Sequence, residues 1–175
     1  VEVKGLNLAP GALQGDAGFY RLLAAQGLIS HSALTVSRGP ARHGLTAGFN
    51  DFSDTFLTLA AIAPLLEGPT KITGIAHTRK QETDRVAGMA RELKKLGQHV
   101  IETEDALEIH PRPLRPGLEI ETYHDHRFAM SFGILGCHDT LKNGQSWLTI
   151  KDPGCCAKTF PAFFDLLAGL RADSH

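Results

Sequence analysis

The chain has 175 residues, of which 42% are hydrophobic and 21% are charged. This composition is typical of one globular domain with a substantial core and excludes a mainly disordered chain. The formal net charge of −1 at pH 7 excludes a global basic field, and the apolar runs are too short to span a bilayer, so we expect neither nucleic acid nor a membrane as a partner.

The N-terminal residues show no signal-peptide pattern, and the chain begins with Val1 instead of Met, so we expect the native start to lie elsewhere. The three cysteines, Cys137, Cys155 and Cys156, are odd in number and lack the spacing of a metal site. Because adjacent cysteines rarely form a disulfide, we expect small buried thiols in a reducing, cytoplasmic compartment.

The first half of the chain predicts alternating strands and helices. In chain order these are strand 1–6, helix 15–27, strand 32–38, helix 53–68 and strand 70–75. Asp16 is the expected N-cap of the first helix, and Gly27 ends it. The second helix is wholly apolar, with Ser53 or Asp54 as its expected N-cap, and Pro64 either kinks it or ends it early.

The second half continues the alternation. Its predicted elements are helix 82–98, two short strands within 99–110 around an acidic turn, strand 117–123, helix 125–136, strand 146–152 and helix 157–170. Asp125 is the expected cap of the second of these helices. The apolar face of the first helix is expected to carry Val86, Met89, Ala90, Leu93 and Leu96.

The two halves resemble each other. Residues 49–75 and 122–150 each contain an acidic turn, a wholly apolar helix, a glycine and an alternating strand. This predicts an α/β fold of repeated βαβαββ units, divided as 1–75 and 76–175. Helices that are apolar all round are buried, so we expect buried parallel helices inside and sheets outside.

The stretch HTRKQETDR, residues 77–85, crowds charge where a strand passes into a helix. Glu82 and Arg85 are three residues apart and are expected on one face at the helix start. A helix N-terminus with an arginine favours an anion site. The alternative is a solvated cap, in which Glu82 and Asp84 complement the helix dipole and Arg85 pairs with one of them.

Two further cations are predicted at helix starts. In YHDHRFAM, Arg127 falls in a first helical turn, where a cation is unfavourable unless an anion lies beside it. Lys158 falls near the start of the last helix; the alternative is a lysine whose stem covers a core helix. His124, Asp125 and His126 offer a metal site, but the sequence places no third ligand with the two histidines.

Asp51 and Asp54 precede the apolar helix 53–68, where each is either a helix cap or a base held near a buried helix start. If the helices are parallel, their N-termini meet at one end of the domain. Arg85, Arg127 and Lys158 would then converge on a small dianion, with Glu82 and Asp54 beside it.

These residues resemble the C-terminal half of the EPSP synthase (3-phosphoshikimate 1-carboxyvinyltransferase) family. The resemblance rests on QGD at 14–16, SDT before an apolar helix, GIAHTRKQETDR, ARELKKLG, YHDHRFAM and AKTFPAFF, in the family's order across nearly the whole chain. It implies an inside-out α/β barrel domain of the enolpyruvyl transferase type, here incomplete.

The resemblance implies transfer of the enolpyruvyl group from phosphoenolpyruvate to the 5-hydroxyl of shikimate 3-phosphate, a step towards chorismate and the aromatic amino acids. It implies no metal and no organic cofactor. The residues it assigns are catalytic Asp54, Glu82 and His126, phosphoenolpyruvate-binding Arg85, Arg127 and Lys158, and shikimate 3-phosphate-binding Asp54, Gln81 and His77.

Two departures from the family pattern qualify this implication. Gln81 stands where many members carry a lysine, and an amide donates a hydrogen bond but supplies no charge or proton. Family members are also more than twice as long, with two domains. We therefore expect the N-terminal domain to be the missing partner, the lone chain to be inactive, and its exposed unit edge to self-associate.

Three other interpretations remain open from the sequence. A UDP-N-acetylglucosamine enolpyruvyl transferase shares the implied fold. A catalytically dead interaction domain would account for Gln81 and the short length. A metal-binding module is the third, resting on the two histidines beside Asp125.

Overall fold

A computed structural model describes residues 15–32 and 35–172. The strand expected over residues 1–6 lies outside these ranges. Within them, no helix combines the length and the hydropathy needed to cross a bilayer.

The N-terminal part is a helix followed by a hairpin, namely α1 (Ala17–Ala25), β1 (Ile29–Ser32) and β2 (Thr35–Arg38). Asp16 is the N-cap residue of α1, although its side chain makes no capping hydrogen bond. Gly27 follows with a φ of +67°, a conformation that glycine adopts without strain and that ends the helix as predicted. The single strand expected over 32–38 is instead an antiparallel hairpin.

The central part forms one four-stranded sheet with two helices on it. Its elements are β3 (Thr46–Gly48), the 3₁₀ helix η1 (Asn50–Thr55), α2 (Phe56–Ile62), the 3₁₀ helix η2 (Ala63–Leu65), β4 (Thr70–Thr73), the 3₁₀ helix η3 (Ala76–Lys80), α3 (Arg85–Lys95), β5 (His99–Glu102) and β6 (Ala106–His110). The strand order is β3-β4-β6-β5, and only the β3–β4 pair is parallel.

The C-terminal part repeats the start of this pattern. Its elements are β7 (Leu118–Ile120), α4 (His126–Gly136), β8 (Leu148–Ile150), the 3₁₀ helix η4 (Pro153–Lys158) and α5 (Phe163–Ala172). Strands β7 and β8 are parallel and joined through α4, as β3 and β4 are joined through α2. The likeness of segments 49–75 and 122–150 is therefore confirmed as two strand–helix–strand crossovers.

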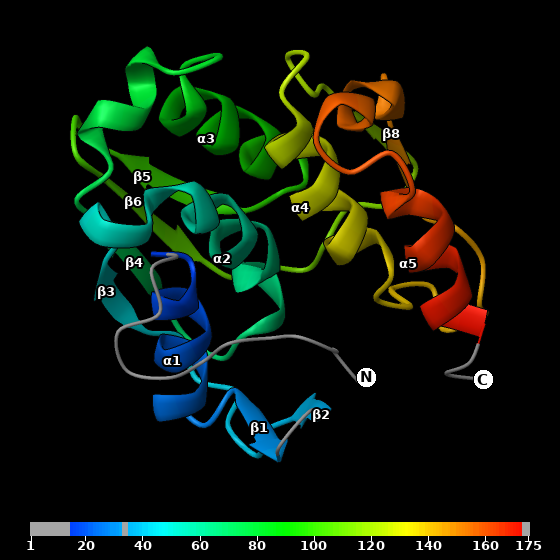
Figure 1. The fold of residues 1–175 in the computed structure, drawn as a ribbon, viewed down its shortest axis with the longest axis horizontal. Coiled ribbons are helices and arrows are strands. Elements are labelled where there is room, and N and C mark those ends of the chain that lie inside the picture. The colour runs from blue at the N-terminus through cyan, green and yellow to red at the C-terminus, as the bar shows by residue number, and fades with distance from the viewer. Residues whose placement is uncertain (1–14, 33–34, 173–175) are drawn as a thin grey trace.

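Helices lie between the sheets. In Figure 1, α2 and α3 cover one face of the four-stranded sheet, and α4 lies beyond α2, towards β8 and α5. The core is built from large side chains of these layers, among them the fully buried Phe49, Phe56, Phe128 and Phe132. The expected α/β class, with buried helices and outer sheets, is confirmed for the described residues, since α2 and α4 are mostly buried.

The division into units 1–75 and 76–175 stays a proposal. Between Thr46 and His110 the elements follow in the order β3-α2-β4-α3-β5-β6, and all four strands belong to one sheet. This sheet therefore combines strands from both sides of residue 75.

Three local predictions were wrong at helix starts. Neither Ser53 nor Asp54 caps α2, because both precede it in a 3₁₀ turn and Thr55 is the N-cap residue. Glu82 lies in the loop before α3, so helical spacing does not relate it to Arg85. The last helix starts at Phe163, and its expected first residues form η4 and a turn instead.

The contact of α3 with Phe128 of α4 predicts a packing constraint at Gly88. A Cβ on Gly88 would lie 2.6 Å from Phe128 Cζ and 3.3 Å from Tyr123 Cε2, and Phe128 is fully buried. In G88A, overpacking of about 1–3 kcal/mol opposes a helix-propensity gain of up to about 1 kcal/mol, so the free energy of unfolding should fall by about 1–2 kcal/mol, measured by urea denaturation. The control G169A meets nothing within 4 Å and should gain up to about 1 kcal/mol from helix propensity. An unchanged midpoint for G88A would contradict this packing.

Candidate active site

The N-terminal ends of α2, α3 and α4 meet around the side chain of Arg85. Arg85 is the first residue of α3 and is only 3% exposed. Its Nε donates to Asp125 Oδ2 at 2.7 Å, and its Nη1 donates to Asp54 Oδ1 at 2.9 Å and to Gln81 Oε1. One buried guanidinium therefore joins the loop before α3 to the starts of the other two helices.

Asp125 is the fully buried carboxylate of the site. It is the N-cap residue of α4, where its Oδ1 accepts from the backbone N–H of Arg127 at 2.9 Å, while its Oδ2 accepts from Arg85. The sequence predicted its role as a cap, which is confirmed, but not its ion pair. The signal was its place beside His126 and Arg127 in a charged run at a helix start.

The turn before Asp125 is held in an unusual conformation. Tyr123 and His124 have φ values of +55° and +57°, which non-glycine residues rarely adopt. The buried carboxylate of Glu92 accepts from the hydroxyl of Tyr123 at 2.8 Å and from the backbone N–H of Glu121 at 3.1 Å. These bonds from α3 stabilise the turn that aims Asp125 and the residues after it at the site.

Asp54 bridges the two arginines. Its Oδ2 lies 2.6 Å from Arg127 Nη2, and its Oδ1 accepts from Arg85. The Nε of Arg127 is buried and has no hydrogen-bond partner among the described residues. The structure therefore brings Arg85 and Arg127 together, as the sequence predicted, and leaves one arginine donor without an acceptor.

Glu82 connects the third cation to a histidine. Lys158 Nζ donates to Glu82 Oε1 at 2.8 Å, and Glu82 Oε2 lies 3.6 Å from His126 Nδ1. His126 is 7% exposed, and its Nδ1 lacks a hydrogen-bond partner within the described ranges. All three predicted cations are thus gathered in one site, although Lys158 comes from η4 and not from the last helix.

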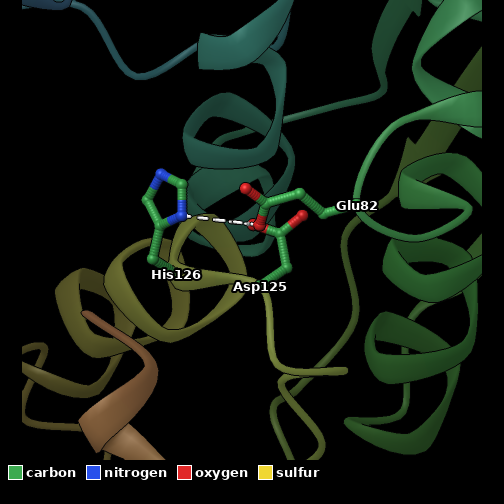
Figure 2. Close-up of side chains that lie close together, drawn as sticks. All are labelled: Glu82, Asp125 and His126. Carbon is green, nitrogen blue, oxygen red and sulfur yellow. Dashed lines mark ion pairs between the residues drawn. The ribbon is translucent and has the colours of Figure 1, made fainter. Parts of the chain in front are cut away.

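The structure groups a different set of possible metal ligands from the one that the sequence suggested. Figure 2 shows Glu82, Asp125 and His126 facing one another. One possible ligand atom of each lies within 4.8 Å of the other two. His124 is not part of this group, since its side chain is 89% exposed and pairs with Asp152 at 2.8 Å. The two carboxylates already bind Lys158 and Arg85, so a metal ion would compete with cations in place.

The remaining predicted residues lie around this centre. His77 Nε2 is 2.8 Å from Ser53 Oγ, which links η3 to η1. Gln81 uses its side-chain oxygen to accept from Arg85, which leaves its NH₂ group as a donor. Asp51 is exposed and accepts from the side chain of Asn50 at 3.3 Å, so, like His124, it is a sequence candidate that does not contribute to the site.

The electrostatic balance differs from the expected positive hollow. Arg85, Arg127 and Lys158 are matched by Asp54, Asp125 and Glu82 in the ion pairs just described. An anion entering the site would therefore exchange with carboxylates. Asp54 and Glu82 are partly exposed and Asp125 is not, so Asp54 and Glu82 are the two that can give way.

Burial lowers the pKa of His126 below its ordinary value. Desolvation is the largest cause, and the charges of Arg127 and Lys158 act in the same direction, against the carboxylates of Glu82 and Asp125. The imidazole is therefore neutral at pH 7 and can accept a proton. A carboxylate, an imidazole and three fixed cations are the groups that proton transfer next to an anionic substrate needs.

The fold and this site define an enolpyruvyl transferase-type domain. The EPSP synthase of Acinetobacter baumannii superimposes with a TM-score of 0.68 at 27% identity, over 88% of this chain and 38% of that one. The enolpyruvyl transferase NikO of Streptomyces tendae, with a TM-score of 0.62 at 22% identity over 88% of this chain and 35% of that one, shares the fold.

The family follows from the sequence matches. The family model for EPSP synthase (3-phosphoshikimate 1-carboxyvinyltransferase) matches residues 1–167, and the chain belongs to this family. The 3-phosphoshikimate 1-carboxyvinyltransferases of Opitutus terrae and Nostoc punctiforme are 61% and 42% identical over 97% and 93% of this chain. The chain spans 37% of the length of each.

The buried pair of Arg85 and Asp125 predicts a large cost for D125N. The amide leaves the buried guanidinium with the partly exposed Asp54 as its remaining charged partner, so the free energy of unfolding should fall by about 2–4 kcal/mol. The control E121Q removes one partner of the exposed Lys151–Glu121 pair and should cost less than about 1 kcal/mol. Urea denaturation measures both, and equal losses would contradict the assigned burial of the Arg85 pair.

The lowered pKa of His126 predicts a pH dependence of stability. The unfolded chain takes up a proton near the ordinary histidine pKa of about 6.5, where the folded chain does not. Proton uptake by His126 in the unfolded chain therefore lowers the free energy of unfolding as the pH falls through about 6.5. H126Q should lose the contribution, whereas H43Q, at an exposed site, should keep it. Denaturation between about pH 7.5 and about pH 5 measures this; a pH-independent difference between native and H126Q would contradict it.

Proposed function

We propose that the protein to which this chain belongs transfers the enolpyruvyl group of phosphoenolpyruvate to the 5-hydroxyl of shikimate 3-phosphate, releasing phosphate. The observation that carries the proposal is the convergence of Arg85, Arg127 and Lys158 at the starts of α3 and α4 and the end of η4. Family membership supports it over a sugar-nucleotide transferase, because the matching model is that of EPSP synthase.

The phosphoenolpyruvate-binding residues in this proposal are the three cations. Arg127 Nε is a buried donor without an acceptor among the described residues, and a buried unpaired donor is costly unless a ligand satisfies it. A carboxylate fits the guanidinium fork, and a phosphate group fits the point charge of a lysine. Binding would move Asp54 from Arg127 and Glu82 from Lys158, freeing both carboxylates for chemistry.

The catalytic residues in this proposal are Asp54, Glu82 and His126. Addition of the 5-hydroxyl to phosphoenolpyruvate removes a proton from oxygen and places one on the methylene carbon; elimination of phosphate reverses the transfer at carbon. Asp54 is the proposed base at the hydroxyl, and Glu82 carries the carbon proton. Neutral His126, 3.6 Å from Glu82, is placed to exchange a proton with it.

The shikimate 3-phosphate contacts proposed for this chain are Asp54, Gln81 and His77. Gln81 stands where many members carry a lysine. Its side-chain oxygen accepts a hydrogen bond from Arg85. Its NH₂ group can still donate to a substrate hydroxyl, without supplying charge. The reaction needs no metal or organic cofactor in this proposal.

The remaining proposals concern partners and compartment. The chain spans 37% of its relatives' length, and we propose that an N-terminal domain supplies most of the shikimate 3-phosphate site. We place the protein in the cytoplasm, because the neighbouring Cys155 and Cys156 are free thiols. Self-association of the lone chain through an exposed unit edge is a further proposal.

A catalytically dead domain is disfavoured because six charged groups remain matched at the site.

The activity is testable in a chimera, the Opitutus terrae relative with its matching segment replaced by this chain. The native chimera should release phosphate from phosphoenolpyruvate in the presence of shikimate 3-phosphate, and the 175-residue chain alone should not. E82Q should lower kcat about 10²- to 10⁴-fold through loss of a proton-transfer group. The control E67Q, at an exposed site, should keep the native rate. A silent native chimera would overturn the proposed function. An active lone chain would overturn only the proposal that an N-terminal domain is required.

A further inference from the structure

Arg79 is a partly buried arginine outside the predicted site whose donors are all used. Its Nη1 donates to both carboxylate oxygens of Asp84 at 3.1 and 3.0 Å. Its Nη2 donates to Glu102 Oε1 at 3.0 Å and to the carbonyl of Thr103 at 2.6 Å, and its Nε donates to the carbonyl of Glu104 at 2.9 Å. A guanidinium has five N–H groups, so these bonds saturate it.

The pair of Arg79 and Asp84 closes a short loop. Between them lie Gln81 and Glu82, in a segment without helix or strand. Asp84 also caps α3, since its Oδ1 accepts from the backbone N–H of Ala87 at 2.9 Å. One ion pair therefore fixes both ends of the loop that carries Glu82 and also the helix start that presents Arg85.

The turn between β5 and β6 anchors this loop to the sheet. Besides the bonds from Arg79, Asp105 accepts from the backbone N–H of Gly74 at 3.0 Å and of Ala76 at 2.9 Å. These bonds, from Ala76 first, lower the pKa of Asp105. The turn between β5 and β6 therefore binds the segment before the loop at Gly74 and Ala76, and the bonds of Arg79 add a third point of attachment.

We propose that Arg79 is a positioning residue that holds Glu82, and through Asp84 also Arg85, in place for the reaction. The expected effect of Arg79 on the reaction rests on the proposed function. Its role in holding the loop rests on its hydrogen bonds alone. The Arg79 side chain is 15% exposed and is directed at the hairpin turn and Asp84. It acts on the site through the loop backbone and not by touching substrate.

Lysine cannot reproduce this arrangement. It keeps the charge but has three donors on one nitrogen, so it cannot bridge Asp84, Glu102 and the two turn carbonyls together. A misplacement of about 1 Å at a catalytic group costs up to about 10²-fold in rate. R79K in the chimera should therefore lower kcat about 10- to 100-fold. The matched control R42K, whose native side chain donates to the carbonyls of Gly39 and Ala41, should keep the native kcat.

A double-mutant cycle with Glu82 separates positioning from general destabilisation. If Arg79 acts mainly through Glu82, R79K should lower kcat by a smaller factor in an E82Q background than in the native one, because only its effect through Arg85 then remains. The same fold loss in both backgrounds would overturn the inference. Native kcat in R79K, with the chimera active, would overturn it while leaving the proposed function standing.

Backbone hydrogen exchange of the 175-residue chain tests the geometry without activity. R79K should speed exchange of the amides of residues 80–87, including the Ala87 N–H bonded to Asp84, whereas R42K should not. Unchanged protection in R79K would overturn the inference even if the chimera is active. If the native chimera is silent, the proposed function fails, and this measurement still decides the role of Arg79.

Discussion

The buried ion pair between Arg85 and Asp125 is the interaction on which the site depends. Each partner is the first or capping residue of its own helix, so their 2.7 Å contact fixes the N-terminal ends of α3 and α4 against each other. Loss of either charge leaves the other buried and incompletely compensated, which is strongly unfavourable. The start of α2 joins through Asp54, which shares the same guanidinium. The packing of three helices and the geometry of the site are therefore one constraint.

The same network bears on the proposed function, in which a site of balanced charge takes an anionic substrate. The buried Asp125 is a fixed counter-charge for Arg85, whereas the partly exposed Asp54 and Glu82 pair with Arg127 and Lys158. The fixed pair preserves the site's shape, and the exposed pairs can exchange with an incoming dianion. The groups that give way are the same two carboxylates to which we assign proton transfer. Binding of the anion and release of the catalytic carboxylates would thus be the same event.

Much of the fold was predictable because its signals are local. Apolar periodicity placed α3 and its buried face, and the wholly apolar segments placed α2 and α4 between sheets. Asp125 as a cap and Gly27 as an end were predictable because caps act within one helical turn. The errors fell where local signals competed: Ser53 and Asp54 are both good caps by residue type, but His77 and two arginines bind them instead. The start of the last helix was likewise replaced by η4, which carries Lys158 to Glu82.

The sequence by itself determined the family, the alternation of strands and helices, and which charged residues stand at helix starts, because residue order and local propensity carry that information. Only the tertiary structure decided which charge meets which. Arg85 binds Asp125, forty positions away, and not Glu82 or Asp84 nearby. Asp84 is taken by Arg79, and Glu82 by Lys158. Pairings of this kind depend on distance and burial in the folded chain, and neither quantity is written in the local sequence.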